Sequence, residues 1–270
     1  MNLSCERLPL LIAIALASPA VAQTPEVSLG SVEVTGVRDT SSASAHTVDA
    51  STLKALRPAT SDTASLLRNV PGVSLYGAGG VSSLPSIRGL ADDRLRIKVD
   101  GMDLIAACPN HMNPALSYLD PSNVGRLAVF AGVTPVSVGG DSIGGTIVAE
   151  TPPPRFARAG EGSLVAGEIG AYYRSNGNAS GGNIAAAYAT ESFSIAYAGA
   201  TAESGNVSAG RDFKTSSVTG RPGHTLPLDE VGSTAYKSRN HELGIAFAGG
   251  GHLVEARVGY QDIPYQLWPN

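Results

Sequence analysis

The pattern of hydrophobic and polar positions changes three times along the chain. A continuous apolar run covers residues 8–17, short helical and strand patterns follow one another over 46–153, and apolar and polar positions alternate from about 162 onward. Alternation with a period of two is typical of half-buried β-strands. These changes predict a short leader, a mixed α+β domain and an all-β part.

The apolar run predicts a secretory signal peptide. Arg7 precedes the run, and Ala20 and Ala22 provide a cleavage site of small residues before Gln23. A membrane anchor is the alternative, but the run is too short to cross a bilayer as a helix. We expect residues 1–22 to be removed on export, and Cys5 with them.

The α+β part, 46–153, is expected to contain a short helix and several strands. Ser61 or Asp62 can cap a helix over 61–70, and Pro71-Gly72 ends it. Asp100-Gly101, between alternating residues, indicates a hairpin turn. The strands are expected at 72–77, 85–90, 94–99, 124–132 and 144–152.

The all-β part is expected to hold about five strands, each about as long as a tilted membrane strand. One face of each strand is apolar and aromatic, and the other is small and polar. A soluble sandwich would show the same alternation and is the alternative. The connection after the first strand is short and the one over 204–238 is long, as in barrels with short turns on one side. The strands lie near 162–174, 181–190, 192–203, 239–249 and 251–261.

Composition and charge narrow the class of protein. The chain has 32 glycines, 2 cysteines and 16% charged residues, which favours a β-rich exported protein over a disulfide scaffold or a disordered chain. A net charge of -4 gives no electrostatic reason to expect a nucleic-acid partner. The histidines are scattered, and neither H-E-x-x-H nor G-x-S-x-G is present, so we expect no enzyme.

The stretch "AACPNHMNP", residues 106–114, carries the candidate chemistry. Without the leader, Cys108 is the one remaining cysteine, which suggests an intermolecular bond or a reactive or ligating thiol. If Pro109 begins a helical turn, Cys108 and Met112 share one face, with Cβ atoms about 5–6 Å apart. Soft thiolate and thioether ligands select Cu(I). The pair therefore predicts a copper site.

Alternatives remain for each of these residues. His111 points away from the shared face, so it is either an imidazole ligand or a polar loop residue. Met102 is expected to be buried in the hairpin. A buried Cys108 beside a gap-filling Met112 is the alternative to the metal site.

Several segments, in order over about 25–155, resemble TonB-dependent receptors. "SLGSVEVTGV" resembles a TonB box, and "TASLLRNVPGV", "SIRGL", "IKVDGM" and "VGGDSIGGTIVAETP" resemble consecutive plug segments. The resemblance implies a plug inside a barrel of about 22 strands in the outer membrane of a Gram-negative bacterium. It implies outer-membrane lipid and TonB, with its inner-membrane energising complex, as partners. The box residues are Ser31, Val32, Glu33, Val34, Thr35, Gly36 and Val37.

"VDGMDLIAACPNHMNPALSYLDPSNV" resembles the copper-receptor branch of this family. The resemblance implies that Cys108 and Met112 bind a copper ion, a substrate rather than a catalytic cofactor, with a further thioether from a barrel loop outside this chain. A siderophore or haem receptor is one alternative. A periplasmic copper-binding or signalling plug module is another.

The predicted fold is an α+β plug, with a small mixed sheet and short helices, followed by the first antiparallel strands of a transmembrane β-barrel. Because about five strands are present, we expect the barrel to be incomplete. The chain is then a fragment, the product of a truncated reading frame, or one of two chains that together form the barrel. The predicted domains are a signal peptide (1–22), TonB box and flexible linker (23–45), plug (46–153) and barrel strands (154–270).

Overall fold

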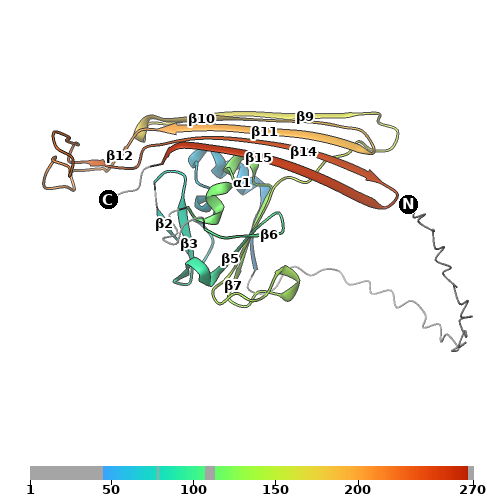
Figure 1. Cartoon of the computed structure of the whole chain (residues 1–270), viewed down its shortest axis with the longest axis horizontal. Helices are drawn as coiled ribbons and strands as arrows, with labels where there is room; N and C mark the ends of the chain where they lie inside the picture. The colour runs from blue at the N-terminus through green and yellow to red at the C-terminus, as the bar shows by residue number, and fades with distance from the viewer. Residues whose placement is uncertain (1–44, 78, 107–112, 267–270) are drawn as a thin grey trace, which may run out of the picture. The chain divides into compact units, whose positions relative to one another are not determined.

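The computed structural model describes residues 45–77, 79–106 and 113–266. Residues 45–153 form a mixed α+β domain, called the plug below, and residues 164–266 form a sheet of long strands, called the long sheet (Figure 1). All of these residues fall within one compact unit of the chain. No helix in the described ranges is long and apolar enough to cross a bilayer.

The plug is built on a five-stranded mixed sheet in the order β1-β7-β8-β5-β6. β5 and β8 are parallel, and the other neighbours are antiparallel. A second, three-stranded sheet has the order β2-β3-β4. The strands are β1 (Ala45–Val48), β2 (Val73–Gly77), β3 (Ser83–Ile87), β4 (Leu90–Ala91), β5 (Leu95–Val99), β6 (Met102–Leu104), β7 (Arg126–Ala131) and β8 (Gly145–Glu150).

Apolar residues on alternate positions of the sheet form the plug core. Leu127 and Val129 of β7 and Ile147 of β8 are at most 1% exposed and pack with Leu53 and Leu116 from the helices. The opposite face of β7 and β8 is also buried, through Ala128, Phe130 and Val148. Burial on both faces explains the near-continuous apolar sequences of these two strands.

One α-helix and several 3-10 helices cover the plug sheet. They are α1 (Ala50–Leu56), η1 (Arg57–Ala59), η2 (Thr63–Leu67), η3 (Asp92–Arg94), η4 (Ala115–Tyr118), η5 (Pro121–Asn123) and η6 (Val136–Val138). The helix expected over 61–70 is η2, and the Asp62 carboxylate accepts a hydrogen bond from Ala64 N. The sequence analysis missed α1. Its cap is Asp49, whose carboxylate accepts from Thr52 N at 2.9 Å.

The predicted plug strands and the Asp100-Gly101 hairpin are confirmed. Val99 pairs with Met102 across a two-residue turn, in which Asp100 has φ 49° and Gly101 φ 82°. The strand expected over 85–90 is divided into β3 and β4. The expectation for Met102 was wrong, because its side chain is 60% exposed. Met102 is the first residue of β6, a three-residue strand at the edge of the sheet. Its side chain is therefore not covered by the plug core.

The long sheet is an antiparallel meander in the order β15-β14-β11-β10-β9. The five predicted strands are confirmed, although β14 begins earlier and β15 ends later than expected. Within the described residues, β15 pairs only with β14 and β9 only with β10, so both edges are open. The strands are β9 (Leu164–Arg174), β10 (Ala179–Ala189), β11 (Phe193–Ser204), β14 (Tyr236–Gly249) and β15 (His252–Gln266).

The two faces of the long sheet differ as the alternation predicts. One face, called the outer face, exposes large apolar side chains, and Val165 and Ile169 are 80% and 83% exposed. The inner face bears polar residues such as Asn240 and Gln261, which contact the plug. An apolar face exposed along the sheet is not the packed arrangement of a soluble sandwich. The exposed apolar residues of the outer face are Val165, Ile169, Tyr173, Ile184, Tyr188, Tyr197, Leu243, Phe247, Val254, Val258 and Tyr260.

The connections of the long sheet correct one part of the sequence argument. The short turn that contains η7 (Asn176–Asn178) follows β9, and the long loop over 205–235 follows β11. β9 and β11 run in the same direction, so these two connections lie at the same end of the sheet rather than on opposite sides. The opposite end has two short connections, at 190–192 and 250–251. Within the long loop, β12 (Val207–Ser208) pairs with β13 (Glu230–Val231).

Candidate functional site

The predicted copper ligands Cys108, His111 and Met112 lie outside the described residues. The TonB box, 31–37, and the leader, 1–22, also lie outside them. The structure describes both flanks of the segment that carries the copper ligands. On one side β6 leads to Ala106, and on the other side Asn113 and Pro114 lead into η4.

The flank after the predicted ligands is fixed in the plug. Leu116 of η4 and Val124 are fully buried in the plug core. Ser117 Oγ donates to Pro114 O at 2.7 Å, which closes the turn. Asp120 caps η5, because its carboxylate accepts from both Ser122 N and Ser122 Oγ. Local hydrogen bonds and core packing therefore hold this segment from the plug side.

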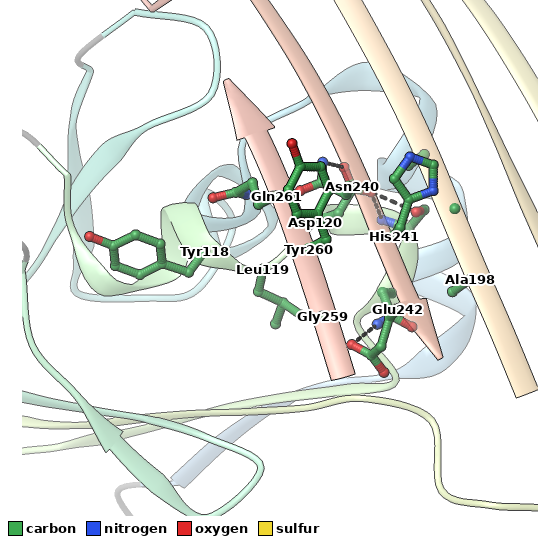
Figure 2. Close-up of a pocket in the computed structure, with 14 residues that line it drawn as sticks. Tyr118, Leu119, Asp120, Ala198, Asn240, His241, Glu242, Gly259, Tyr260 and Gln261 are labelled. Atoms are coloured by element: carbon green, nitrogen blue, oxygen red, sulfur yellow. Dashed lines mark hydrogen bonds between the residues drawn. The ribbon is translucent and has the colours of Figure 1, made fainter. Parts of the chain in front are cut away.

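A chain of amide side chains holds the same segment from the long sheet. Gln261 Nε2 of β15 donates to Ser117 O at 2.9 Å and to Asn240 Oδ1 at 2.8 Å. Asn240 Nδ2 of β14 donates to Asp120 Oδ2 at 2.9 Å. Figure 2 shows these side chains converging on one pocket. The segment that follows the predicted copper ligands is thus bonded directly to two strands of the long sheet.

Asp120 is the plug carboxylate at this contact. Burial raises its pKa above the ordinary value, while hydrogen bonds from Ser122 and Asn240 and the charge of Arg57 act in the opposite direction. Beside it, Asn123 Nδ2 donates to Glu242 Oε2 of β14 at 2.8 Å. Glu242 also pairs with the Arg257 guanidinium, 3.4 Å from its Oε1, so each carboxylate is stabilised by an amide hydrogen bond and by a nearby arginine.

Two cavities lie between the plug and the long sheet on either side of Asp120. One has a volume of about 220 Å³ and the other about 260 Å³, and Asp120, Ser122 and Ala200 line both. The long sheet contributes small inward residues there, including Gly170 and Ala198, which leave room beside the plug. Polar, roomy gaps of this kind can hold water. The interface is therefore held at separate polar points rather than by continuous apolar packing.

Arg257 forms a further contact, near the Asp100-Gly101 turn. Its guanidinium donates to Thr151 Oγ1 and to Pro152 O, and lies 4.0 Å from Asp100 Oδ2. Asp100 also accepts from Thr151 N at 2.8 Å. Arg257 thus connects β15 to the hairpin turn and to the end of β8.

No group of three or more His, Cys, Asp or Glu side chains that could hold a metal occurs among the described residues. The sequence analysis missed the contact residues Asn240, Gln261, Glu242 and Arg257. The sequence did contain a signal for these residues: each is a polar residue at an inward position of a predicted strand, where a polar contact is to be expected. Their partners in the plug could not be predicted, since they depend on how the plug meets the sheet.

Comparisons with known proteins match the plug to a family and the whole fold to solved structures. Residues 37–146 match the TonB-dependent Receptor Plug Domain, a receptor family rather than an enzyme family. No curated protein matches the chain.

Solved structures with the same fold include several receptors. The structure titled "Copper transporter OprC" is 25% identical, covers 81% of this chain and 30% of its own, and has a TM-score of 0.62. The FrpB iron transporter from Neisseria meningitidis is 18% identical, with 81% and 31% covered and a TM-score of 0.59. The Serratia marcescens hemophore receptor HasR is 17% identical, with 82% and 32% covered and a TM-score of 0.57.

The chain spans about a third of the length of each of these structures. The two with lower identity show the fold alone. The match over 37–146, the mixed plug sheet and the meander with its polar inner face agree with one another. Residues 37–146 are therefore a TonB-dependent receptor plug domain, and the antiparallel strands that follow have the fold of the barrel strands in such receptors.

Proposed function

We propose that this chain functions in a TonB-dependent outer-membrane receptor that binds and takes up copper. The observation that carries the proposal is the spacing of Cys108 and Met112, the one cysteine and one of the two methionines left after the predicted leader. A thiolate and a thioether four residues apart offer one soft ion two soft ligands. His111 is proposed as a weaker, third contributor.

The described flank of the sulfur pair and one similar protein support the proposal. The flank that follows the sulfur pair is held by core packing and by Gln261 and Asn240. The similar protein named as a copper transporter adds support at 25% identity.

The outer face of the long sheet supports a membrane location. It exposes about ten large apolar side chains, and transfer of each from water is worth roughly 1.5–3 kcal/mol. Because these side chains are 37–83% exposed, the sum is on the order of 10 kcal/mol, which favours a lipid environment for this face. At the end of the outer face next to the loop 205–235, β11, β14 and β15 bear charged residues, which form the ion pairs Lys237–Glu203 and Arg239–Asp262. This succession is typical of a barrel surface at the edge of the bilayer.

The remaining parts of the proposal concern the N-terminal region. Residues 1–22 are proposed as a cleaved signal peptide, and 31–37 as the strand that TonB binds. A β-prone segment in a polar linker suits recognition by strand addition. The plug is proposed to extend over 46–153 and the barrel strands over 154–270.

Titration with Cu(I) under reducing conditions tests the copper site in the chain without the predicted leader, residues 23–270, so that Cys5 is absent. Cys108→Ser replaces a soft thiolate by a hard hydroxyl and is expected to lose most of the affinity. Met112→Ala is expected to weaken Cu(I) binding more than Cu(II) binding, and His111→Ala to matter less than either. Met102→Leu is the matched control, since it removes the other methionine thioether outside the leader and is expected to leave the affinity unchanged.

The Cys108→Ser variant can also contradict the proposal. If Cys108→Ser binds Cu(I) as tightly as the parent chain, the copper proposal fails. A siderophore or haem receptor with the same plug and strands then becomes the better explanation.

A further inference from the structure

Four side chains meet at one hydroxyl where the plug touches the long sheet. Ser61 Oγ accepts from Arg174 Nη2 at 2.9 Å and from Tyr236 OH at 3.0 Å, and lies 2.7 Å from Tyr172 OH. Since the serine oxygen already accepts twice, its own proton is available for Tyr172. Arg174 also donates to Tyr236 OH at 2.7 Å and lies over the Tyr172 ring. The three side chains of the long sheet are thus connected through a single plug residue.

A small apolar cluster beside this hydroxyl fixes the Tyr236 ring. Val81 of the plug packs with Tyr236 and Ala202, and each of these three residues is at most 5% exposed. Gly80 lies directly against the ring, because a Cβ atom built there would be 2.1 Å from Tyr236 Cε1. The plug therefore holds Tyr236 by a hydrogen bond at the phenol oxygen and by close contact at the ring.

Tyr236 and Arg174 are the strand residues next to the two connections at this end of the sheet, the loop 205–235 and the turn that contains η7. Tyr236 is the first residue of β14, directly after the loop 205–235. The preceding residues Thr234 and Ala235 donate their backbone N–H groups to Asn206 Oδ1, which closes the base of the loop.

Arg174 is the last residue of β9, directly before the turn that contains Asn176. The Asn176 side chain forms two hydrogen bonds with the backbone of Ser208, in the loop 205–235. Ser61 is therefore linked to this loop by two routes, through Tyr236 and through Arg174.

We propose that Ser61 couples the position of the plug to the order of the loop 205–235. With the plug in place, the Ser61 hydroxyl and Gly80 fix Tyr236, at the base of the loop, and Ser61 also fixes Arg174, beside the turn whose Asn176 is hydrogen-bonded to the loop. Displacement of the plug removes the shared acceptor and the ring contact together, and the loop is released. The coupling involves neither copper nor the TonB box, so it can fail or hold independently of the proposed function.

Hydrogen–deuterium exchange on the 270-residue chain in detergent micelles tests the coupling. Ser61→Ala removes the shared acceptor, and amides in 205–235 are expected to exchange about fivefold faster, because bonds of this kind each contribute modestly to local order. Exchange in β7 and β8 is expected to stay within about twofold of the parent, since these strands lie in the plug core. Ser74→Ala, at an exposed serine of β2, is the matched control and is expected to change neither region.

Gly80→Ala is the second variant, in case Ser61→Ala does not fold. It displaces the Tyr236 ring from the plug side and is expected to accelerate exchange in the same loop. Loop exchange unchanged in the folded variant would overturn the coupling. Acceleration spread equally over β7, β8 and the loop would also overturn it, because the effect would then be a general loss of stability.

Discussion

The contact between Asp120 and Asn240 predicts a measurable coupling energy between the plug and the long sheet. Asn240 Nδ2 donates to the Asp120 carboxylate at 2.9 Å, and this carboxylate, which also accepts from Ser122, is partly buried. A hydrogen bond to a charged group contributes about 1.5–3 kcal/mol. A double-mutant cycle with Asp120→Ala, Asn240→Ala and the double variant is therefore expected to give a coupling energy in that range.

Hydrogen exchange of residues 115–124 is the suitable assay, because it reports the local opening free energy of the segment that Asp120 and Asn240 hold. Each single variant is expected to lower this free energy, and the double variant to lower it by less than the sum. The ion pair Lys237–Glu203 on the outer face is the control. Its atoms are closer, at 2.6 Å, but Glu203 is half exposed, so its cycle is expected to give only about 0.2–1 kcal/mol.

A coupling energy near zero for Asp120 and Asn240 would refute the reasoning. It would mean that the amide chain does not hold the segment, however short its hydrogen bonds are. Equal coupling energies for Asp120–Asn240 and Lys237–Glu203 would refute a narrower point. They would show that burial of the carboxylate does not increase the coupling energy.

Further predictions concern pH, the core and the partner strand. Because burial raises the pKa of Asp120, its stabilising contribution is complete below the unfolded-state pKa, near about 3.9, and is lost as pH rises through the folded-state pKa. The unfolding free energy of the parent minus that of Asp120→Asn, measured in urea titrations, should therefore decrease as pH rises above about 4. Leu127→Ala should destabilise the plug by about 2–5 kcal/mol in the same titrations, because Leu127 is fully buried, and a loss under 1 kcal/mol would contradict the packing of β7. Val34→Pro should abolish TonB binding in a pull-down, since proline removes a backbone donor from the added strand, and unchanged binding would indicate a plain linker.

Much of the fold could be predicted because local patterns decide it. The alternation over 162–261 fixed which residues face outward, and Asp100-Gly101 fixed the hairpin. Two errors show the limits of such patterns. Met102 occupies a position that the alternating pattern assigns to the buried face, but it lies in an edge strand and is exposed. The sequence does not reveal which strand is at the edge. The helix α1 was missed because its main signal is the capping hydrogen bond between Asp49 and Thr52.

The contacts between the plug and the long sheet could not be predicted. Asp120 and Asn240 are 120 residues apart along the chain, and their meeting depends on how two separately patterned parts come together. The polar inward positions of β14 and β15 indicated that something polar faces them. Nothing in the sequence indicated that the flank of the predicted copper ligands is bonded to these positions.

X-ray absorption at the copper edge tests the central proposal most directly. The chain without its predicted leader, residues 23–270, loaded with one Cu(I), should show two sulfur neighbours, at distances close to about 2.3 Å, as in metal–thiolate bonds. Met112→Ala should retain one of them, and Cys108→Ser should lose the shorter one. A parent spectrum with only nitrogen or oxygen neighbours near about 2.0 Å would contradict a copper site formed by Cys108 and Met112.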